Sequence, residues 1–122
     1  MLLILNGCSG SGWNLRTPPS TAQSPPVYPN ASSVQTQTVA WDYPTPKRVT
    51  NFNTDAESDT ILAYYKEVLT KDGWEVSASD QKGRLHFYWT GGCPVYGIDV
   101  IVESVVTKQT SVRLEVIETP CH

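Results

Sequence analysis

The chain has 122 residues, enough for one domain with a modest hydrophobic core. Twelve acidic and nine basic residues give a formal net charge of −3, and because the basic residues form no cluster, we expect no nucleic-acid partner. No apolar stretch approaches the roughly eighteen residues of a spanning helix, so the sequence predicts none.

The first residues are apolar and lead into Leu5-Asn6-Gly7-Cys8. This stretch resembles the lipobox of bacterial lipoproteins, whose usual form is leucine, a small residue, glycine or alanine, then cysteine. The resemblance implies cleavage after Gly7, a diacylglyceryl thioether on the Cys8 thiol, and often an added N-acyl chain such as palmitate. We therefore expect residues 1–8 to be a truncated lipoprotein signal. Cys8 would anchor the protein in the cell envelope, on the extracytoplasmic side of a bacterial membrane.

Residues 9–36 are rich in proline, serine and threonine and contain little that could build a core. We expect a disordered tether that favours extended polyproline II conformations. At ~3.1 Å per residue its reach is on the order of 80 Å. The folded domain would then occupy residues 37–122.

The domain begins with an alternating stretch that holds Val39, Trp41 and Tyr43 and ends at two prolines. The alternation predicts an edge strand or an extended arm laid against the domain. Residues 47–53 follow as a weaker strand candidate.

A helix is expected over residues 55–72. Thr54 and Glu57 have the spacing of a capping box, with Thr54 as the N-cap. Apolar residues then recur on one helical face, and Gly73 and Trp74 are placed for a left-handed C-terminal cap. The stripe consists of Ile61, Leu62, Tyr65, Val68 and Leu69.

Four more strands are predicted after the helix, because apolar and polar residues alternate in four successive stretches. The fold class is therefore α+β, with one amphipathic helix packed on a mainly antiparallel sheet of about five strands. The order is strand, helix, then four strands. This architecture loosely resembles small domains of envelope lipoproteins that serve as assembly factors or accessory subunits. The inward apolar residues of the four strands are Trp74, Val76, Ala78, Leu85, Phe87, Trp89, Tyr96, Ile98, Val100, Val102, Val112, Leu114 and Val116.

In the last two strands the inward apolar residues are even-numbered, so these residues of both strands must lie on the same face of the sheet. Paired residue numbers should then sum to an even value, so that Val102 and Leu114 lie on one face. This parity predicts a loop of three or five residues near Lys108, rather than two.

Cys93 and Cys121 lie near the far ends of these two strands and form an even pair once Cys8 is lipidated. In an oxidising compartment we expect a disulfide between them. The alternative is a zinc site that adds His86 and His122, but the spacing matches no usual zinc arrangement. We expect no metal and no cofactor.

The outward side of the sheet contains carboxylates, which we interpret as an exposed charge ladder interleaved with Arg113. Apolar residues among them indicate that an arm or another protein covers this side. The leading hypothesis is a lipid-anchored, non-catalytic binding module or accessory subunit of an envelope complex. The alternative is a cell-surface hydrolase acting on glycan or peptide through these carboxylates. The carboxylates are Asp99, Glu103, Glu115 and Glu118, and the expected partner face comprises Trp41, Tyr43, Tyr88, Val95, Ile101, Val105 and Ile117.

Overall fold

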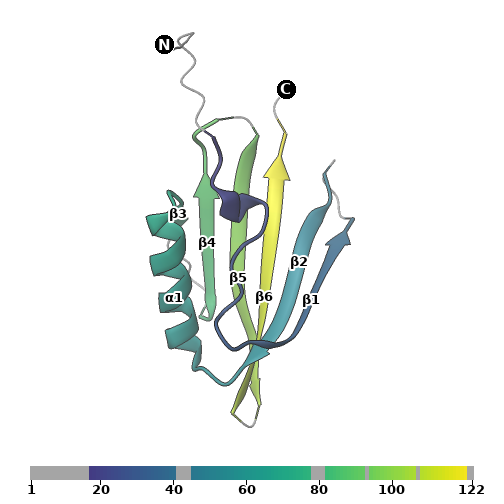
Figure 1. The fold of residues 1–122 in the computed structure, drawn as a ribbon, viewed down its shortest axis with the longest axis vertical. Helices are drawn as coiled ribbons and strands as arrows, with labels where there is room; N and C mark the ends of the chain where they lie inside the picture. The colour runs from purple at the N-terminus through teal and green to yellow at the C-terminus, as the bar shows by residue number, and fades with distance from the viewer. Residues whose placement is uncertain (1–16, 41–44, 78–81, 93, 107, 121–122) are drawn as a thin grey trace.

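One antiparallel sheet of six strands organises the protein (Figure 1). The computed structural model describes residues 17–40, 45–77, 82–92, 94–106 and 108–120. Cys8, Trp41, Tyr43 and the residues of the expected disulfide lie outside these ranges. The elements are the 3-10 turn η1 (Ser20–Ala22), β1 (Ser32–Val39), β2 (Lys47–Thr54), α1 (Ser58–Lys71), β3 (Glu75–Ser77), β4 (Arg84–Trp89), β5 (Val95–Val106) and β6 (Gln109–Thr119).

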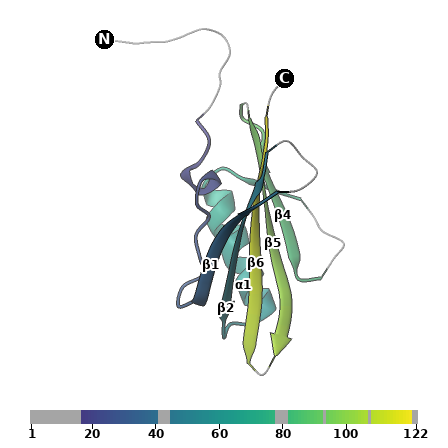
Figure 2. The ribbon, with the colours of Figure 1, turned by 90° about the vertical axis from the view of Figure 1, so that its right-hand side faces the viewer.

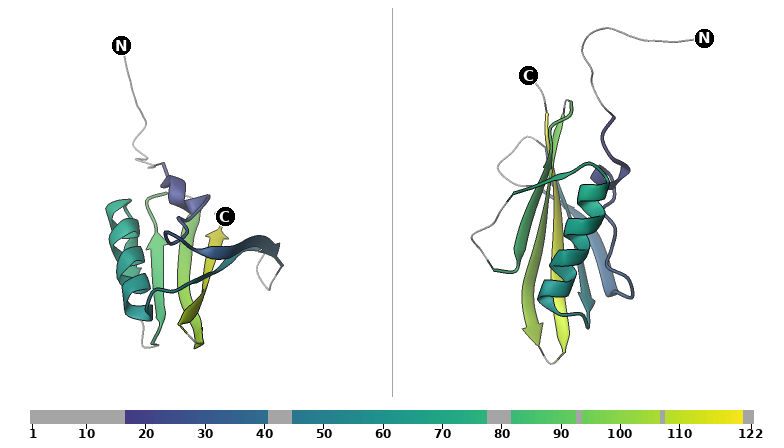
Figure 3. Two further views of the ribbon diagram at one scale, coloured as in Figure 1. Left: turned by 60° about the horizontal axis from the view of Figure 1, so that its bottom comes forward. Right: turned by 90° about the vertical axis from the view of Figure 1, so that its left-hand side faces the viewer.

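The α+β architecture is confirmed, although the described chain has six strands and not about five. The strand order is β1-β2-β6-β5-β4-β3, and every neighbouring pair is antiparallel. The additional strand is β1, which lies largely within residues expected to be a tether. β1 is an edge strand, and it overlaps the stretch predicted as an edge strand or arm only at residues 37–39. The helix α1 connects β2 to β3 and covers one side of the sheet, called here the inner face (Figure 3).

The register of the β5–β6 hairpin confirms one part of the parity prediction and corrects the other. Val102 pairs with Val112, and Val100 pairs with Leu114, so Val102 and Leu114 share the inner face. The ladder shifts between Val102 and Ser104, and Val106 then pairs with Gln109. Only two residues separate that last pair, so the prediction of an odd loop was wrong. A β-bulge at Glu103 absorbs the extra residue, and period-two reasoning cannot anticipate a bulge.

The helix begins later than the capping box suggested. Glu57 is the N-cap, and its side chain makes no capping hydrogen bond. Thr54 ends β2, pairs with Thr110, and accepts a 3.3 Å hydrogen bond from the Ala56 backbone N–H. The motif therefore closes a turn between β2 and α1, and does not start the helix, because Thr54 is already held in the sheet ladder.

The predicted C-terminal cap is confirmed. Gly73 has φ +100°, in the left-handed region that favours glycine. The Gly73 N–H donates to the Thr70 carbonyl at 3.2 Å, and the Trp74 N–H donates to the Leu69 carbonyl at 3.0 Å. Trp74 and Leu69 are both buried, so the apolar contact that accompanies this cap links the helix end to β3.

Residues 17–31, called here the N-terminal strap, lie on the inner face beside α1 (Figures 1 and 3). This corrects the expectation of a disordered tether for the described part of residues 9–36. Ala22 is fully buried in the core, and Tyr65 Oη donates to the Pro26 carbonyl at 2.7 Å. Trp74 Nε1 donates to Thr21 Oγ1 at 2.7 Å. Composition favoured disorder, but a few small and apolar residues fill the part of the inner face that one helix leaves open.

The hydrophobic core lies between the sheet and its two covering segments. Its side chains come from the inward positions of β2, β4, β5 and β6, from three positions of α1, from Trp74 just after the helix and from the strap. No helix in the described ranges is long and apolar enough to cross a membrane. The core comprises Ala22, Phe52, Ile61, Tyr65, Leu69, Trp74, Phe87, Trp89, Tyr96, Ile98, Val100, Val112, Leu114 and Val116.

Candidate functional site

The side of the sheet opposite α1, called here the outer face, has no described helix or strap over it (Figure 3). In β2, in β6 and in β5 before the bulge, the odd-numbered residues point to the outer face. In β4 the even-numbered residues do so. Across the middle of this face the register aligns His86, Asp99, Glu115 and Val49 in one row. The structure thus brings two of the four predicted carboxylates, Asp99 and Glu115, directly opposite one another.

Asp99 is held by two residues of β4. His86 Nδ1 lies 2.6 Å from Asp99 Oδ1, and Arg84 Nη2 donates to Asp99 Oδ2 at 3.1 Å. The Asp99 side chain is only 10% exposed, because these longer side chains cover it. His86 points outward as expected, but it is bound to a carboxylate and also stacks on Tyr88.

Glu115 is held from the other side. Lys47 Nζ donates to Glu115 Oε1 at 3.0 Å, and Arg113 Nε lies 3.0 Å from Glu115 Oε2. Arg113 also pairs with Glu103 at 3.4 Å through Nη1. The buried Arg113 Nε makes no well-directed hydrogen bond, so its contribution here is mainly electrostatic. Like charges opposed on neighbouring strands destabilise a sheet, and the flanking cations offset that repulsion.

This arrangement is poorly suited to acid–base chemistry at the opposed pair. Each of the four carboxylate oxygens of Asp99 and Glu115 already lies within 3.1 Å of a nitrogen. A carboxyl that transfers a proton to a substrate must instead reach the substrate atom itself. The prediction of an exposed charge ladder is confirmed only in part. Asp99, Glu115 and Arg113 lie on the outer face, but Asp99 and Glu115 are buried under their partners in a structural ion-pair network. Glu118 pairs with Tyr96 on the inner face and was assigned to the wrong side.

Apolar side chains lie on either side of the central row. Tyr88, Val95, Ile101 and Ile117 are all half-buried on this face, where the sequence placed them. Val105 is different. It pairs with Thr110, whose hydroxyl bonds to the Ala56 carbonyl on the helix side, so the bulge at Glu103 has turned Val105 to the inner side. Val105 is therefore not part of the outer face.

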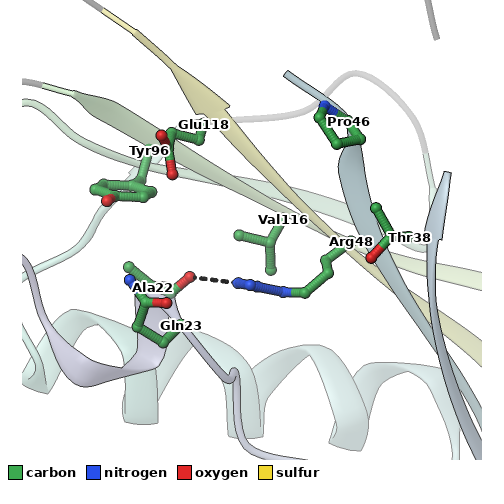
Figure 4. Close-up of a pocket in the computed structure, with 8 residues that line it drawn as sticks. All are labelled: Ala22, Gln23, Thr38, Pro46, Arg48, Tyr96, Val116 and Glu118. Atoms are coloured by element: carbon green, nitrogen blue, oxygen red, sulfur yellow. Dashed lines mark hydrogen bonds between the residues drawn. The ribbon is translucent and has the colours of Figure 1, made fainter. Parts of the chain in front are cut away.

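A small cavity lies on the other side of the sheet, between the strap and the strands (Figure 4). Its volume is about 160 Å³, room for a few waters or a small polar molecule. Figure 4 shows Arg48 reaching the Ala22 carbonyl, to which it donates at 2.9 Å, while Glu118 lies beside Tyr96. Burial and then the Glu118 carboxylate raise the pKa of Tyr96, and Arg48 opposes that rise.

A second cavity, of about 250 Å³, lies at the start of β1 and is bordered by Glu103. Each of these two cavities therefore holds one carboxylate, Glu118 in the first and Glu103 in the second. Neither provides the two close acidic residues that a glycoside hydrolase needs.

The expected disulfide lies outside the described residues and stays a prediction. The last pair of the β5–β6 ladder is Val95 with Thr119. Cys93 comes two residues before Val95 in the sequence, and Cys121 comes two residues after Thr119. Within the described ranges no group of three His, Cys, Asp or Glu side chains is placed to hold a metal ion.

Sequence reasoning missed the contributions of Lys47, Arg48 and the strap. Lys47 and Arg48 stand at the start of a weak strand candidate, where no pattern indicates a charge partner far along the chain. The placement of Lys47 beside Glu115 depends on β2 pairing with β6, and strand order cannot be read from alternation. Comparison of the chain with protein-family models, curated proteins and solved structures yields no match.

Proposed function

We propose that this protein is a lipid-anchored, non-catalytic binding module of a bacterial cell envelope, an accessory subunit that binds another envelope protein through its outer face. The observation that carries the proposal is the asymmetry of the sheet. Both covering segments lie on the inner face, and half-buried Tyr88, Ile101 and Ile117 remain among ion pairs on the other. Several apolar side chains on neighbouring strands, on a side that no described segment covers, favour a surface that binds another protein.

The charges of this face favour a specific partner over a lipid surface. The described network contains three carboxylates, from Asp99, Glu103 and Glu115, which are balanced by Arg84, Lys47 and Arg113. A balanced pattern has no net attraction for an anionic membrane. It can instead select a partner by matching charges position by position.

The anchor in this proposal is Cys8. The described chain begins at Thr17, so residues 9–16 separate the cysteine from the strap. Eight residues span at most about 30 Å when fully extended. The domain would then work close to the membrane, and not at the ~80 Å reach that a 28-residue tether of polyproline II would allow.

The partner face is tested by pull-down from detergent-solubilised membranes, with the lipidated full chain as bait. The double variant Ile101→Thr and Ile117→Thr keeps β-branched residues in both strands but removes apolar surface from the outer face. We expect it to recover the main wild-type partner at least tenfold less, measured by quantitative mass spectrometry. Val105→Thr is the matched control, because Val105 is exposed but lies on the other side. Equal recovery by the double variant and wild type would refute the outer-face assignment.

The anchor is tested separately with Cys8→Ser. Without the thiol no thioether forms, so the protein should move from the membrane fraction to the soluble extracytoplasmic fraction. The measurement is fractionation followed by immunoblotting, with Cys93→Ser as a control that leaves Cys8 intact. Complete retention of the Cys8→Ser protein in membranes would show that lipid on Cys8 is not the anchor.

A further inference from the structure

Among the residues that the structure describes, none forms a strand beside the outer edge of β1, the first strand of the sheet. β1 pairs with β2 along one side only, and Ser32 through Thr38 are all exposed. In Figure 2 β1 lies nearest the viewer, with no described segment in front of it. We infer that β1 pairs with β1 of a second copy of this chain, in antiparallel orientation, to give a continuous twelve-stranded sheet. This inference does not depend on which protein the outer face binds.

Open edges in native proteins are normally protected by charge, proline or shortness. The opposite edge of this sheet follows that rule, because β3 has three residues and starts with Glu75. β1 follows it only at its start, where the ladder with β2 shifts between Ser32 and Gln35, an irregularity that also protects an edge. From Gln35 to Val39 the pairing is regular, and the whole strand, SSVQTQTV, contains no charged residue and no proline. It also contains β-branched valines and threonines, which suit a strand. The regular, uncharged part of this edge, residues 35–39, is suited to strand addition.

The chemistry of β1 favours a second copy over a foreign strand. No charge on β1 selects a partner of opposite sign, and none repels an identical strand. A two-fold axis perpendicular to the sheet and passing beside Thr36 pairs Thr36 with its symmetry mate and Gln35 with Gln37. The structure already shows this kind of pair within one chain, because Thr36 and Thr50 lie opposite and their hydroxyls are 3.0 Å apart. Self-pairing would extend that threonine row across the axis.

The test uses the full chain carrying Cys8→Ser, so that no lipid contributes to association. Sedimentation velocity over a wide concentration range should show a reversible monomer–dimer equilibrium. Thr36→Lys places two ammonium groups at the axis and should weaken the dimer at least tenfold. Thr36→Val, which is equally β-branched and uncharged, should leave the dimer within about threefold of the parent.

A second readout reports the register. Thr36→Cys puts two thiols at the axis, so mild oxidation should link the dimer covalently, whereas Lys66→Cys on the exposed side of α1 should not. A parent protein that stays monomeric at every concentration overturns the inference. So does a dimer that Thr36→Lys leaves unchanged, and so does equal cross-linking at positions 36 and 66.

Discussion

The two faces of the sheet are built from the same strands by different chemistry. Within β6, Leu114 is fully buried on the inner face, while its neighbour Glu115 is almost as buried on the outer face. Leu114 is covered by apolar packing, whereas Glu115 is covered by the side chains of Lys47 and Arg113. Burial alone therefore does not show which face is the core. The inner face excludes water through two covering segments, and the outer face does so only locally, through long side chains paired across strands.

The largest expected change in stability comes from truncating an apolar residue of the inner face, and the matching truncation on the outer face is the comparison. Leu114→Ala leaves a cavity in the core and should lower the free energy of unfolding by about 3–5 kcal/mol. Ile101→Ala removes a half-buried side chain and should cost about 1 kcal/mol in the free domain. Urea denaturation measures both. Equal losses would mean that the outer face is a second core, which would argue against its role as a binding surface.

An intermediate effect is expected from the ion pairs. Glu115→Gln keeps the shape of the side chain but deprives Lys47 and Arg113 of a charged acceptor, which should cost about 1–3 kcal/mol. Relief of the repulsion with Asp99 opposes this loss without cancelling it. Glu67→Gln is the control, because the Glu67–Lys71 pair is largely exposed and should change stability by less than about 0.5 kcal/mol. If both variants unfold at the same urea concentration, the outer network does not stabilise the domain.

The smallest effect concerns the contact of the strap with α1. Tyr65→Phe removes the hydrogen bond to the Pro26 carbonyl and should cost about 1 kcal/mol at neutral pH. Burial, and then the neighbouring Tyr64, raise the pKa of Tyr65 above its ordinary value. The folded state therefore favours the neutral phenol. The stability that the neutral Tyr65 phenol contributes is complete below pH ~10, the ordinary pKa of tyrosine. It is lost as the pH rises from there toward the raised pKa of Tyr65 in the folded state.

The pH dependence sharpens this prediction. Wild-type stability should fall as the pH rises above about 10, and Tyr65→Phe should fall less steeply. Tyr96, whose pKa is also raised, would account for part of the remaining slope. Tyr88→Phe serves as the control, because Tyr88 lies on the other face of the sheet and does not contact Tyr65. Identical pH profiles for wild type and Tyr65→Phe would contradict the expected role of Tyr65.

Local signals in the sequence identified the elements whose cause is local. The stripe of Ile61, Tyr65 and Leu69 identified the helix and its buried side, and Gly73 with Trp74 identified its end. Alternation identified β4, β5 and β6 and separated the two faces. The start of the helix was misplaced because Thr54 has a second role at the end of β2, and that role depends on a pairing with β6 far along the chain.

The features that sequence analysis missed depend on contacts between distant segments. The strap appears disordered by composition, since its order comes from Ala22 and Pro26 meeting the core and not from any local preference. Within the candidate site, Tyr88, Ile101 and Ile117 were assigned to the correct face by parity. Val105 was not, because a single extra residue at Glu103 reverses the alternation beyond it.

The docking of the strap changes how often an anchored domain would meet its partner. A flexible tether confines the domain to a volume that grows roughly as the 3/2 power of its length. If Cys8 is the anchor, as proposed, eight residues instead of 28 separate it from the docked part of the chain, and the same scaling would raise the local concentration near the membrane roughly sixfold. Under that proposal, Ala22, which is buried in the core, would influence the encounter rate as well as the stability. A variant whose strap detaches more easily would, under the same proposal, have a lower local concentration near the membrane even while its domain stayed folded.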